Sequence, residues 1–245
     1  MSSKIRLDKR LLSLGLAPDL TRARAYIWSG LVRIKGQIND KVGALVDESV
    51  DIDLQIKRFV TRGGLKLEEA LLVNDIDLKG KVVLDVGVGH GGFSDCMLQR
   101  GAKKIYAVDV GPAFLVASLQ KESKVVYYPK TNFRYATKKQ IPEEVDFFCV
   151  DVSFISVKKI LPVAVSFLKK GGGAVVLVKP QFEAAKNLVG SGGVIRSDRI
   201  QQEIIFDISE SAKEYGLVAV NVIAASLCGK KKHNQEFLIY FKKEG

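Results

Sequence analysis

The sequence predicts an α/β protein: a doubly wound, mostly parallel sheet with helices on both faces, preceded by a small α+β domain. Three observations predict this fold. From about residue 81 onward, short apolar runs alternate with segments of helical apolar spacing, a pattern typical of βαβ units. A glycine-rich turn over residues 87–92 directly follows the first apolar run. The first 56 residues follow a different pattern, with two short helical segments and a hairpin.

Length and composition agree with two domains. We expect a small domain over residues 1–56, a linker over 57–62 and a large domain over 63–245, because a chain of this length can hold one large domain with an appendage. Apolar residues make up 47% and charged residues 27%, as in ordinary folded proteins. The net charge of +11 favours a polyanionic partner, most often nucleic acid, although solubility alone is a competing explanation.

The cysteines and histidines indicate a metal-free protein of a reducing compartment. The cysteines are odd in number, scattered and set among apolar neighbours, as free thiols are; they are Cys96, Cys149 and Cys228. The only histidines are His90 and His233, and Cys-x-x-Cys is absent. The N-terminus lacks a signal-peptide pattern, and the longest apolar run, around residues 160–168, is too short to cross a bilayer. We expect a cytoplasmic monomer or weak dimer without metal.

Two helices and a strand are predicted at the N-terminus. Apolar spacing from Ile5 to Leu14 predicts a short amphipathic helix. Residues 15–18 interrupt that helix, and Asp19 can cap a second one. Gly30 ends the second helix, and residues 31–36 alternate as a hairpin strand does.

Basic residues gather on the second helix and the following strand. Such clustering is typical of a surface that contacts phosphates, whereas the alternative is a merely solvated face. The candidate RNA contacts, including one residue of the linker, are Arg6, Arg10, Arg22, Arg24, Arg33, Lys35 and Arg62.

Residues 5–52 resemble the RNA-binding module named after a small-subunit ribosomal protein, also called the alpha-L motif. The resemblance rests on Arg6-Leu7-Asp8, Gly15-Leu16, Thr21-Arg22-Ala23-Arg24-Ala25, Ile27, Gly30, Val32 and Gly36. It implies that this domain grips structured RNA through shape and backbone contacts.

The large domain is predicted to alternate strands and helices. A helix begins near Leu65. We expect strands over 82–86, 105–109, 125–128, 147–151, 174–179, 218–223 and 237–241, and helices over 93–99, 157–168 and 199–215.

The first strand ends in a pattern that favours S-adenosylmethionine. Gly87, Gly89 and Gly92 satisfy G-x-G-x-x-G, a weak signal that also fits dinucleotides. Asp85 lies inside the strand end, where a nicotinamide enzyme more usually carries an apolar residue. Asp109 ends the second strand and is placed to hold a ribose diol. The two acids suit S-adenosylmethionine better than a dinucleotide, because S-adenosylmethionine has no pyrophosphate that needs to bind at a helix N-terminus.

Two further strand ends carry polar residues of catalytic type. Asp151 ends one strand and Lys179 ends the next along the chain, so we expect them to be partners at the ligand-binding edge. A ribose hydroxyl needs a base, or a cation that stabilises its alkoxide, and a lysine can serve as either. The competing interpretation of Lys179 is a lysine that merely extends toward solvent. Spacing alone does not single out Lys66 or Glu236. For each of them, a charge that is merely solvated is an equally good interpretation.

Residues 57–241 resemble the TlyA family, which belongs with the FtsJ-like ribose methyltransferases. The shared strings are Arg62-Gly63-Gly64-Leu65-Lys66-Leu67, Gly91-Gly92-Phe93-Ser94-Asp95-Cys96, Tyr106-Ala107-Val108-Asp109-Val110-Gly111, Asp151-Val152-Ser153-Phe154-Ile155-Ser156, Lys179-Pro180-Gln181-Phe182-Glu183 and Gly192-Gly193-Val194-Ile195-Arg196. The resemblance implies a Rossmann-like methyltransferase sheet behind the RNA-binding domain. It also implies methyl transfer from S-adenosylmethionine to the 2′-hydroxyl of cytidines in ribosomal RNA, with ribosomal subunits as partners.

The resemblance assigns roles to residues. It places the catalytic tetrad on Lys66, Asp151, Lys179 and Glu236. It places cofactor contacts on Asp85, Gly87, Gly89, Gly91, Phe93, Asp109 and Asn132, the last toward the adenine.

Three segments depart from the family pattern. Gly-Ala-Ser-Thr-Gly-Gly-Phe is replaced by residues 87–93, in which His90 is bulkier. His233 stands where the family has a glycine, and residues 112–115 lack the usual polar pattern.

Two alternative functions compete with methyl transfer. They are a membrane-active haemolysin, a name often given to this family, and an RNA-binding protein with a degenerate methyltransferase domain. A nicotinamide oxidoreductase is the least favoured, because Asp151 and Lys179 would have no task in it.

Overall fold

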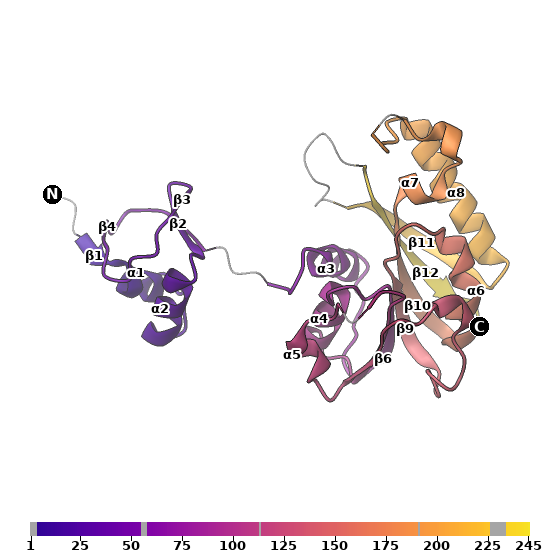
Figure 1. The fold of residues 1–245 in the computed structure, drawn as a ribbon, viewed down its shortest axis with the longest axis horizontal. Coiled ribbons are helices and arrows are strands. Elements are labelled where there is room, and N and C mark those ends of the chain that lie inside the picture. Colours follow the sequence, from indigo (N-terminus) through magenta and orange to yellow (C-terminus); the bar gives the residue numbers. More distant parts are fainter. Residues whose placement is uncertain (1–3, 55–57, 113, 191, 226–233) are drawn as a thin grey trace. The chain divides into compact units, whose positions relative to one another are not determined.

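The computed structural model describes residues 4–54, 58–112, 114–190, 192–225 and 234–245 (Figure 1). The chain divides into two compact units, Met1–Arg58 and Phe59–Gly245. Cys228 and His233 lie outside the described residues.

The first unit packs two helices against short strands. Its elements are β1 (Lys4–Arg6), α1 (Leu7–Ser13), α2 (Leu20–Trp28), β2 (Val32–Ile34), β3 (Gln37–Ile38), β4 (Leu45–Asp47) and β5 (Ile52–Leu54). β1 pairs with β4, and β2 lies between β3 and β5. Apolar residues from both helices and three of the strands form its core, including Leu7, Leu11, Ile27, Val32, Val46 and Ile52.

The start of the first helix differs from the prediction. Ile5 lies in β1, opposite Val46, and the helix begins at Leu7. Strand pairing satisfies the backbone at Ile5, a β-branched residue that suits a strand. The predicted cap of the second helix is confirmed, because the Asp19 side chain accepts a 2.7 Å hydrogen bond from the Arg22 backbone N–H.

The second unit is built on a seven-stranded sheet in the order β11-β12-β10-β9-β6-β7-β8. β12 runs antiparallel to both of its neighbours, whereas the other pairs are parallel. The mostly parallel sheet that the sequence predicts is therefore confirmed. The strands are β6 (Val82–Val86), β7 (Lys104–Val108), β8 (Val125–Tyr128), β9 (Val145–Val150), β10 (Leu168–Val178), β11 (Leu217–Ala224) and β12 (Phe237–Lys243).

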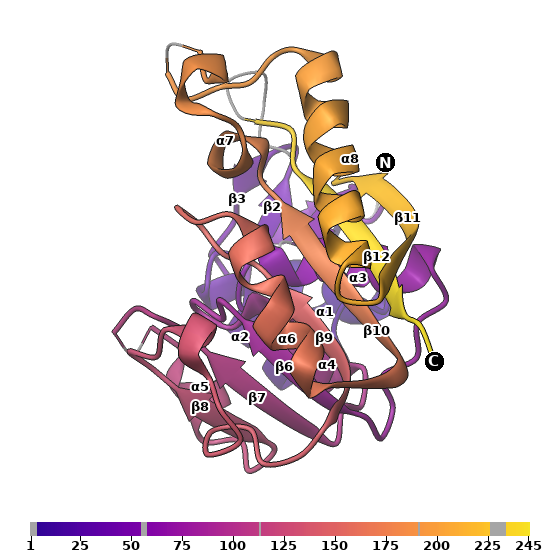
Figure 2. The ribbon, with the colours of Figure 1, turned by 90° about the vertical axis from the view of Figure 1, so that its right-hand side faces the viewer.

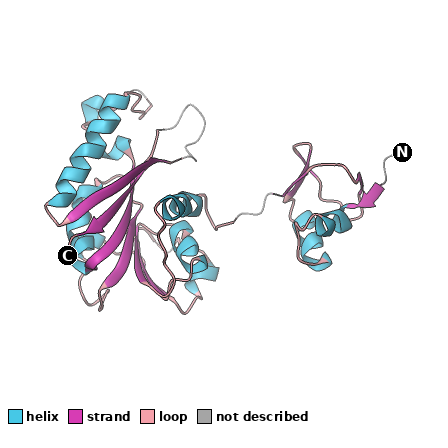
Figure 3. Ribbon diagram, turned by 180° about the vertical axis from the view of Figure 1, so that it is seen from behind, coloured by secondary structure: helices cyan, strands magenta, loops and turns pink. Residues whose placement is uncertain are grey.

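Helices cover both faces of this sheet, as Figure 3 shows from behind. On one face lie α3 (Gly63–Val73), α4 (Gly92–Gln99) and α5 (Ala117–Gln120). On the other lie α6 (Leu161–Phe167) and α8 (Asp198–Lys213), which stand in front of the strands in Figure 2. The short helix α7 (Pro180–Glu183) follows β10.

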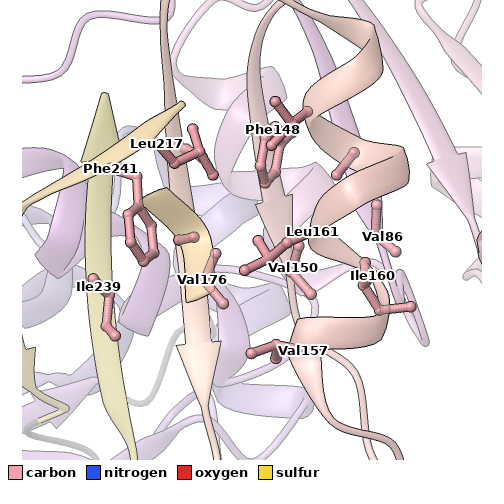
Figure 4. Close-up of a cluster of buried hydrophobic side chains, with 14 of the residues drawn as sticks. Val86, Phe148, Val150, Val157, Ile160, Leu161, Val176, Leu217, Ile239 and Phe241 are labelled. Carbon is pink, nitrogen blue, oxygen red and sulfur yellow. The ribbon is translucent and has the colours of Figure 1, made fainter. Parts of the chain in front are cut away.

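Alternate residues of each central strand enter the two cores. Leu84 and Val86 face α6 and α8, whereas Val83 faces α3 and α4, as the two-residue period of a strand requires. Figure 4 shows Val150 and Val176, from adjacent strands, beside Leu161 of α6. Burial on both faces explains why these strands read as continuous apolar runs.

The predicted helix over 157–168 is shorter in the structure. A 3₁₀ turn, η2 (Val157–Lys159), precedes α6, and β10 already begins at Leu168. Pro162 lies in the first turn of α6, where a residue without an N–H starts a helix more readily than it continues one.

The segment before α3 is packed into the second unit. Phe59 is buried, and a Cβ atom on Gly64 would lie only 2.4 Å from its ring. The Val60 backbone N–H donates to Asp95 Oδ2 at 2.8 Å. Among the helices of the described residues, none is long and apolar enough to span a membrane.

Candidate active site

A cavity of about 770 Å³ opens at the carboxyl ends of β6, β7, β9 and β10. Its size suits a cofactor-sized ligand. In parallel sheets, ligands bind at this edge. The predicted site residues that line it are Gly87, Gly89, Phe93, Asp109, Asn132, Asp151 and Lys179.

One end of the cavity is shaped by Asp109. Its Oδ2 accepts the Gly89 N–H at 2.8 Å, and its Oδ1 accepts the Gly111 N–H at 2.7 Å. The first bond holds the turn after β6 against the turn after β7, and the second closes the turn after β7 itself. A carboxylate has about four acceptor positions, so Asp109 keeps capacity for ligand hydroxyl groups in the same cavity.

Gly87 brings two strand ends into backbone contact. It has φ +87°, and a Cβ atom there would lie 2.2 Å from the Asp151 carbonyl oxygen. The Asp151 N–H donates to the Val86 carbonyl at 2.9 Å. Glycine is therefore required at position 87 both for its backbone conformation and for close approach.

The other glycines of the turn have different tasks. Gly91, at φ +98°, is the N-cap residue of α4, and a Cβ atom there would collide with Leu115 and Leu119. It does not line the cavity. Gly89 has φ +50° with open space where a Cβ would lie.

Asp85 lies beneath the cavity and does not line it. The residue is fully buried, and its Oδ2 accepts a 2.6 Å hydrogen bond from Ser94. Burial raises the pKa of Asp85 to about 7; the charges of Asp151 and Asp109 add to this rise, and the Ser94 hydrogen bonds oppose it. Its Oδ1 has no hydrogen-bond partner among the described residues.

Lys179 and Asp151 form an ion pair at the other end of the cavity. Lys179 Nζ lies 2.5 Å from Asp151 Oδ1 and donates to Ser153 Oγ at 3.0 Å. The two side chains are 13% and 26% exposed, so the pair is shielded from solvent but remains open to the cavity. The predicted partnership of these two strand ends is present.

Lys66 and Glu236 form a second ion pair. They do not line the cavity. Lys66 lies on α3, and Glu236 immediately precedes β12, whose first residue Phe237 pairs with Val178. Because β12 is antiparallel to β10, its start lies at the same edge of the sheet as Lys179. The four predicted catalytic residues therefore form two ion pairs at one edge.

A loop after β9 carries features that sequence reasoning missed. Phe154 has φ +65°, is 89% exposed and lines the cavity. Its ring lies 4.9 Å from the ring of Phe182. Next to it, Glu183 accepts hydrogen bonds from Ser156 Oγ and the Val157 N–H. The only sequence signal was that both segments belong to strings shared with the TlyA family.

His90, the departure in the glycine turn, lines the cavity. Its ring stacks on Phe114, with centroids 5.9 Å apart and planes inclined by 24°. The bulkier side chain thus extends the cavity wall with an aromatic pair.

In the first unit, Arg6 and Arg24 converge on Asp8. Arg6 forms a two-point contact with both carboxylate oxygens, at 3.0 and 2.8 Å, and Arg24 Nε lies 3.1 Å from Oδ2. The hydrogen bond from Arg6 is the main reason why the pKa of Asp8 is lowered to about 2.

The other predicted RNA contacts are not drawn together in this way. Arg22 is exposed on α2, and Arg33 donates to the Gly36 carbonyl across its own hairpin turn at 3.0 Å. Lys35 occupies that turn with φ +50°. Arg10 lies on α1, and Arg62 precedes α3 in the second unit.

Within the described part of the chain, no group of histidine, cysteine or acidic residues could hold a metal ion. Cys96 and Cys149 are both buried.

Comparison with known proteins identifies relatives along the whole chain. The family described as FtsJ-like methyltransferase matches residues 59–243. "Putative rRNA methyltransferase YqxC" of Bacillus subtilis is 39% identical over 98% of this chain and 86% of its own. The 16S/23S rRNA (cytidine-2′-O)-methyltransferase TlyA of Mycobacterium tuberculosis is 34% identical over 97% of this chain and 90% of its own. A solved structure, "Putative hemolysin from Streptococcus thermophilus", has 36% identity and a TM-score of 0.75, covering 100% of this chain and 90% of that chain.

Proposed function

Because this chain belongs to the FtsJ-like methyltransferase family, we propose that it methylates the 2′-hydroxyl of a cytidine in ribosomal RNA, with S-adenosylmethionine as methyl donor. One observation carries the proposal: a single cavity holds the Asp109 carboxylate at one end and the Lys179–Asp151 pair at the other. A cofactor ribose and a substrate hydroxyl can thus be bound in one space.

The residues present fit an adenosyl cofactor. Gly87 lines the cavity, its missing Cβ lets the ends of β6 and β9 meet there, and Asp109 has acceptor capacity for a ribose diol. Asn132 lines the same end, with its Oδ1 accepting from the Arg134 N–H at 3.2 Å. When bound, S-adenosylmethionine supplies an electrophilic methyl group on a positively charged sulfur.

Lys179 is the residue that we assign to the substrate hydroxyl. A neutral amine would take the hydroxyl proton, and an ammonium would stabilise the developing alkoxide through an N–H donor. Asp151 and Ser153 hold the Nζ atom in place in either state. Lys66 and Glu236 form the second charged pair of the proposed tetrad.

The exposed ring of Phe154 supports an unpaired nucleotide as the target. An aromatic side chain at the rim of a cavity can stack on a base that has left its helix. The Phe182 ring backs that of Phe154, which limits its movement. A ribose carried on such a base would be presented to the cavity.

Methyl incorporation tests the proposal directly. Isolated ribosomal subunits are incubated with methyl-labelled S-adenosylmethionine and wild-type protein or Lys179→Ala, and the labelled nucleoside is identified by mass spectrometry. We expect 2′-O-methylcytidine with the wild type and a loss of rate of about 10²–10⁴-fold in the variant. Affinity for S-adenosylmethionine, measured by calorimetry, should change little.

The matched control is Lys213→Ala, which removes an exposed lysine paired with Glu210 on α8. It should methylate at the wild-type rate. Label on a base instead of a ribose, or equal rates for wild type and Lys179→Ala, would contradict the proposal. Because one solved relative is named a hemolysin, dye release from liposomes by the same proteins measures that activity separately.

A further inference from the structure

A series of contacts joins the loop after β9 to the segment after β10, and the contacts follow the same order along both segments. Asp151 and Ser153 contact Lys179, and the Phe154 ring packs on that of Phe182. At the far end, Glu183 contacts Ser156 and Val157. The residue between these contacts with an unusual backbone is Phe154, at φ +65°, a conformation that a non-glycine residue holds only when its surroundings enforce it.

Glu183 uses both carboxylate oxygens in this contact. Ser156 Oγ donates to Oε2 at 2.6 Å, and the Val157 N–H donates to Oε1 at 2.9 Å. The Val157 N–H lies in the first turn of η2, and an N–H group in that position has no acceptor within its own helix. Val157 itself is buried in the core, so one end of this contact is fixed to the body of the unit.

The environment of Glu183 is partly apolar. Burial raises the pKa of its carboxyl group, whereas the hydrogen bonds from Ser156 and Val157 and the charge of Lys158 oppose that rise. Glu183 does not line the cavity. Its contribution is therefore the loop geometry that its two hydrogen bonds fix.

We propose that Glu183 is a positioning residue, which fixes the loop over 153–157 so that Asp151 and Ser153 hold Lys179 toward the cavity. This inference rests on the proposed function of Lys179. Without the Glu183 contact, the Phe154 backbone can relax from its left-handed conformation, and Ser153, the adjacent residue, moves with it. Misplacement of a reacting group by about 1 Å costs roughly 10²-fold in rate.

The test compares Glu183→Ala with the conservative Glu183→Gln. Glutamine can accept from the Val157 N–H and donate to Ser156 Oγ, so it keeps both contacts. We expect kcat for methyl transfer to fall about 10–100-fold in Glu183→Ala, with the KM and calorimetric Kd for S-adenosylmethionine within twofold. Glu183→Gln should retain at least half of the wild-type kcat. Hydrogen exchange of the Val157 amide should quicken in Glu183→Ala only.

Two controls separate positioning from general stability. Glu210→Ala removes an exposed glutamate of α8 and should leave kcat, Kd and amide exchange unchanged. Ser156→Ala removes one of the two contacts of Glu183. The kcat of this variant should lie between that of the wild type and that of Glu183→Ala.

The possible failures are distinguishable. If wild type and Glu183→Ala have equal kcat, or if kcat and cofactor affinity fall together in both Glu183 variants, the positioning role is wrong while the proposed function stands. If the wild type transfers no methyl group to ribose, the proposed function fails and the inference fails with it.

Discussion

At the scale of single residues, Asp85 combines full burial with an oxygen that lacks a partner among the described residues. Its pKa in the folded chain is about 7, against an ordinary value of 3.8. The folded state therefore binds this proton more tightly than the unfolded state does. The stability of the fold falls as the pH rises from about 4 to about 7, and no further change comes from this group above that range.

Asp85→Asn should remove this pH dependence. The amide can still accept from Ser94 and never ionises, so the variant gains stability relative to the wild type by up to about 1.4 kcal/mol per pH unit between pH 4 and pH 7. Urea unfolding followed by circular dichroism at each pH measures the difference. A wild-type-minus-variant difference that stays flat over this range would contradict the assignment of the raised pKa to Asp85.

The sequence predicts some site residues better than others for a physical reason. Asp109, Asp151 and Lys179 directly follow apolar strands, and parallel strands end at one edge, so their meeting follows from the pattern. Lys66 and Glu236 are 170 positions apart and meet through a helix and an antiparallel strand. Spacing carries no information on such a pair, and only the family resemblance singled it out.

At the scale of elements, the glycines before and after β6 offer a clean comparison. Gly87 and Gly80 both have positive φ, at +87° and +73°. At Gly80 a Cβ atom would meet nothing within 4 Å, whereas at Gly87 it would lie 2.2 Å from the Asp151 carbonyl. The pair separates the cost of a strained backbone from the cost of a steric collision.

Gly87→Ala should lower both stability and cofactor binding, because the β6 and β9 ends must separate. Gly80→Ala should cost only the conformational term, about 1–2 kcal/mol, and leave cofactor affinity unchanged. Thermal unfolding and calorimetric titration with S-adenosylmethionine measure the two effects. Equal losses of affinity in both variants would show that the close approach to Asp151 has no role in binding.

Elements with a strong period were predicted well, and those set by local pairing were not. The central strands and α8 follow from continuous apolar runs and from helical spacing. β1 contains only three residues and forms through pairing with β4, which a window of periodicity cannot detect. In the 3₁₀ turn η2, the Val157 N–H donates to Glu183, 26 residues away, a partner that a local window of sequence does not contain.

At the scale of the whole molecule, the two units differ in architecture and in the residues that they expose. The second unit gathers its cavity and both ion pairs at one sheet edge. The first unit carries exposed arginine on α2. With a net charge of +11, the chain suits a polyanionic substrate that is larger than the cavity.

Trp28 allows RNA binding by the first unit to be measured without a label. It is the single tryptophan of the chain, lies at the end of α2 and is 72% exposed. We expect its fluorescence to change when a structured ribosomal RNA fragment is added, with an affinity that falls steeply as salt rises. Arg22→Ala should weaken binding and lower the slope of log Kd against log salt by about one.

The cap of α2 survives this change, because Asp19 accepts from the Arg22 backbone and not from its side chain. Arg199→Ala, which removes an 88% exposed arginine of α8, is the matched control and should preserve both affinity and slope. An unchanged slope in Arg22→Ala, or an equal loss in both variants, would place the RNA contacts elsewhere than on α2.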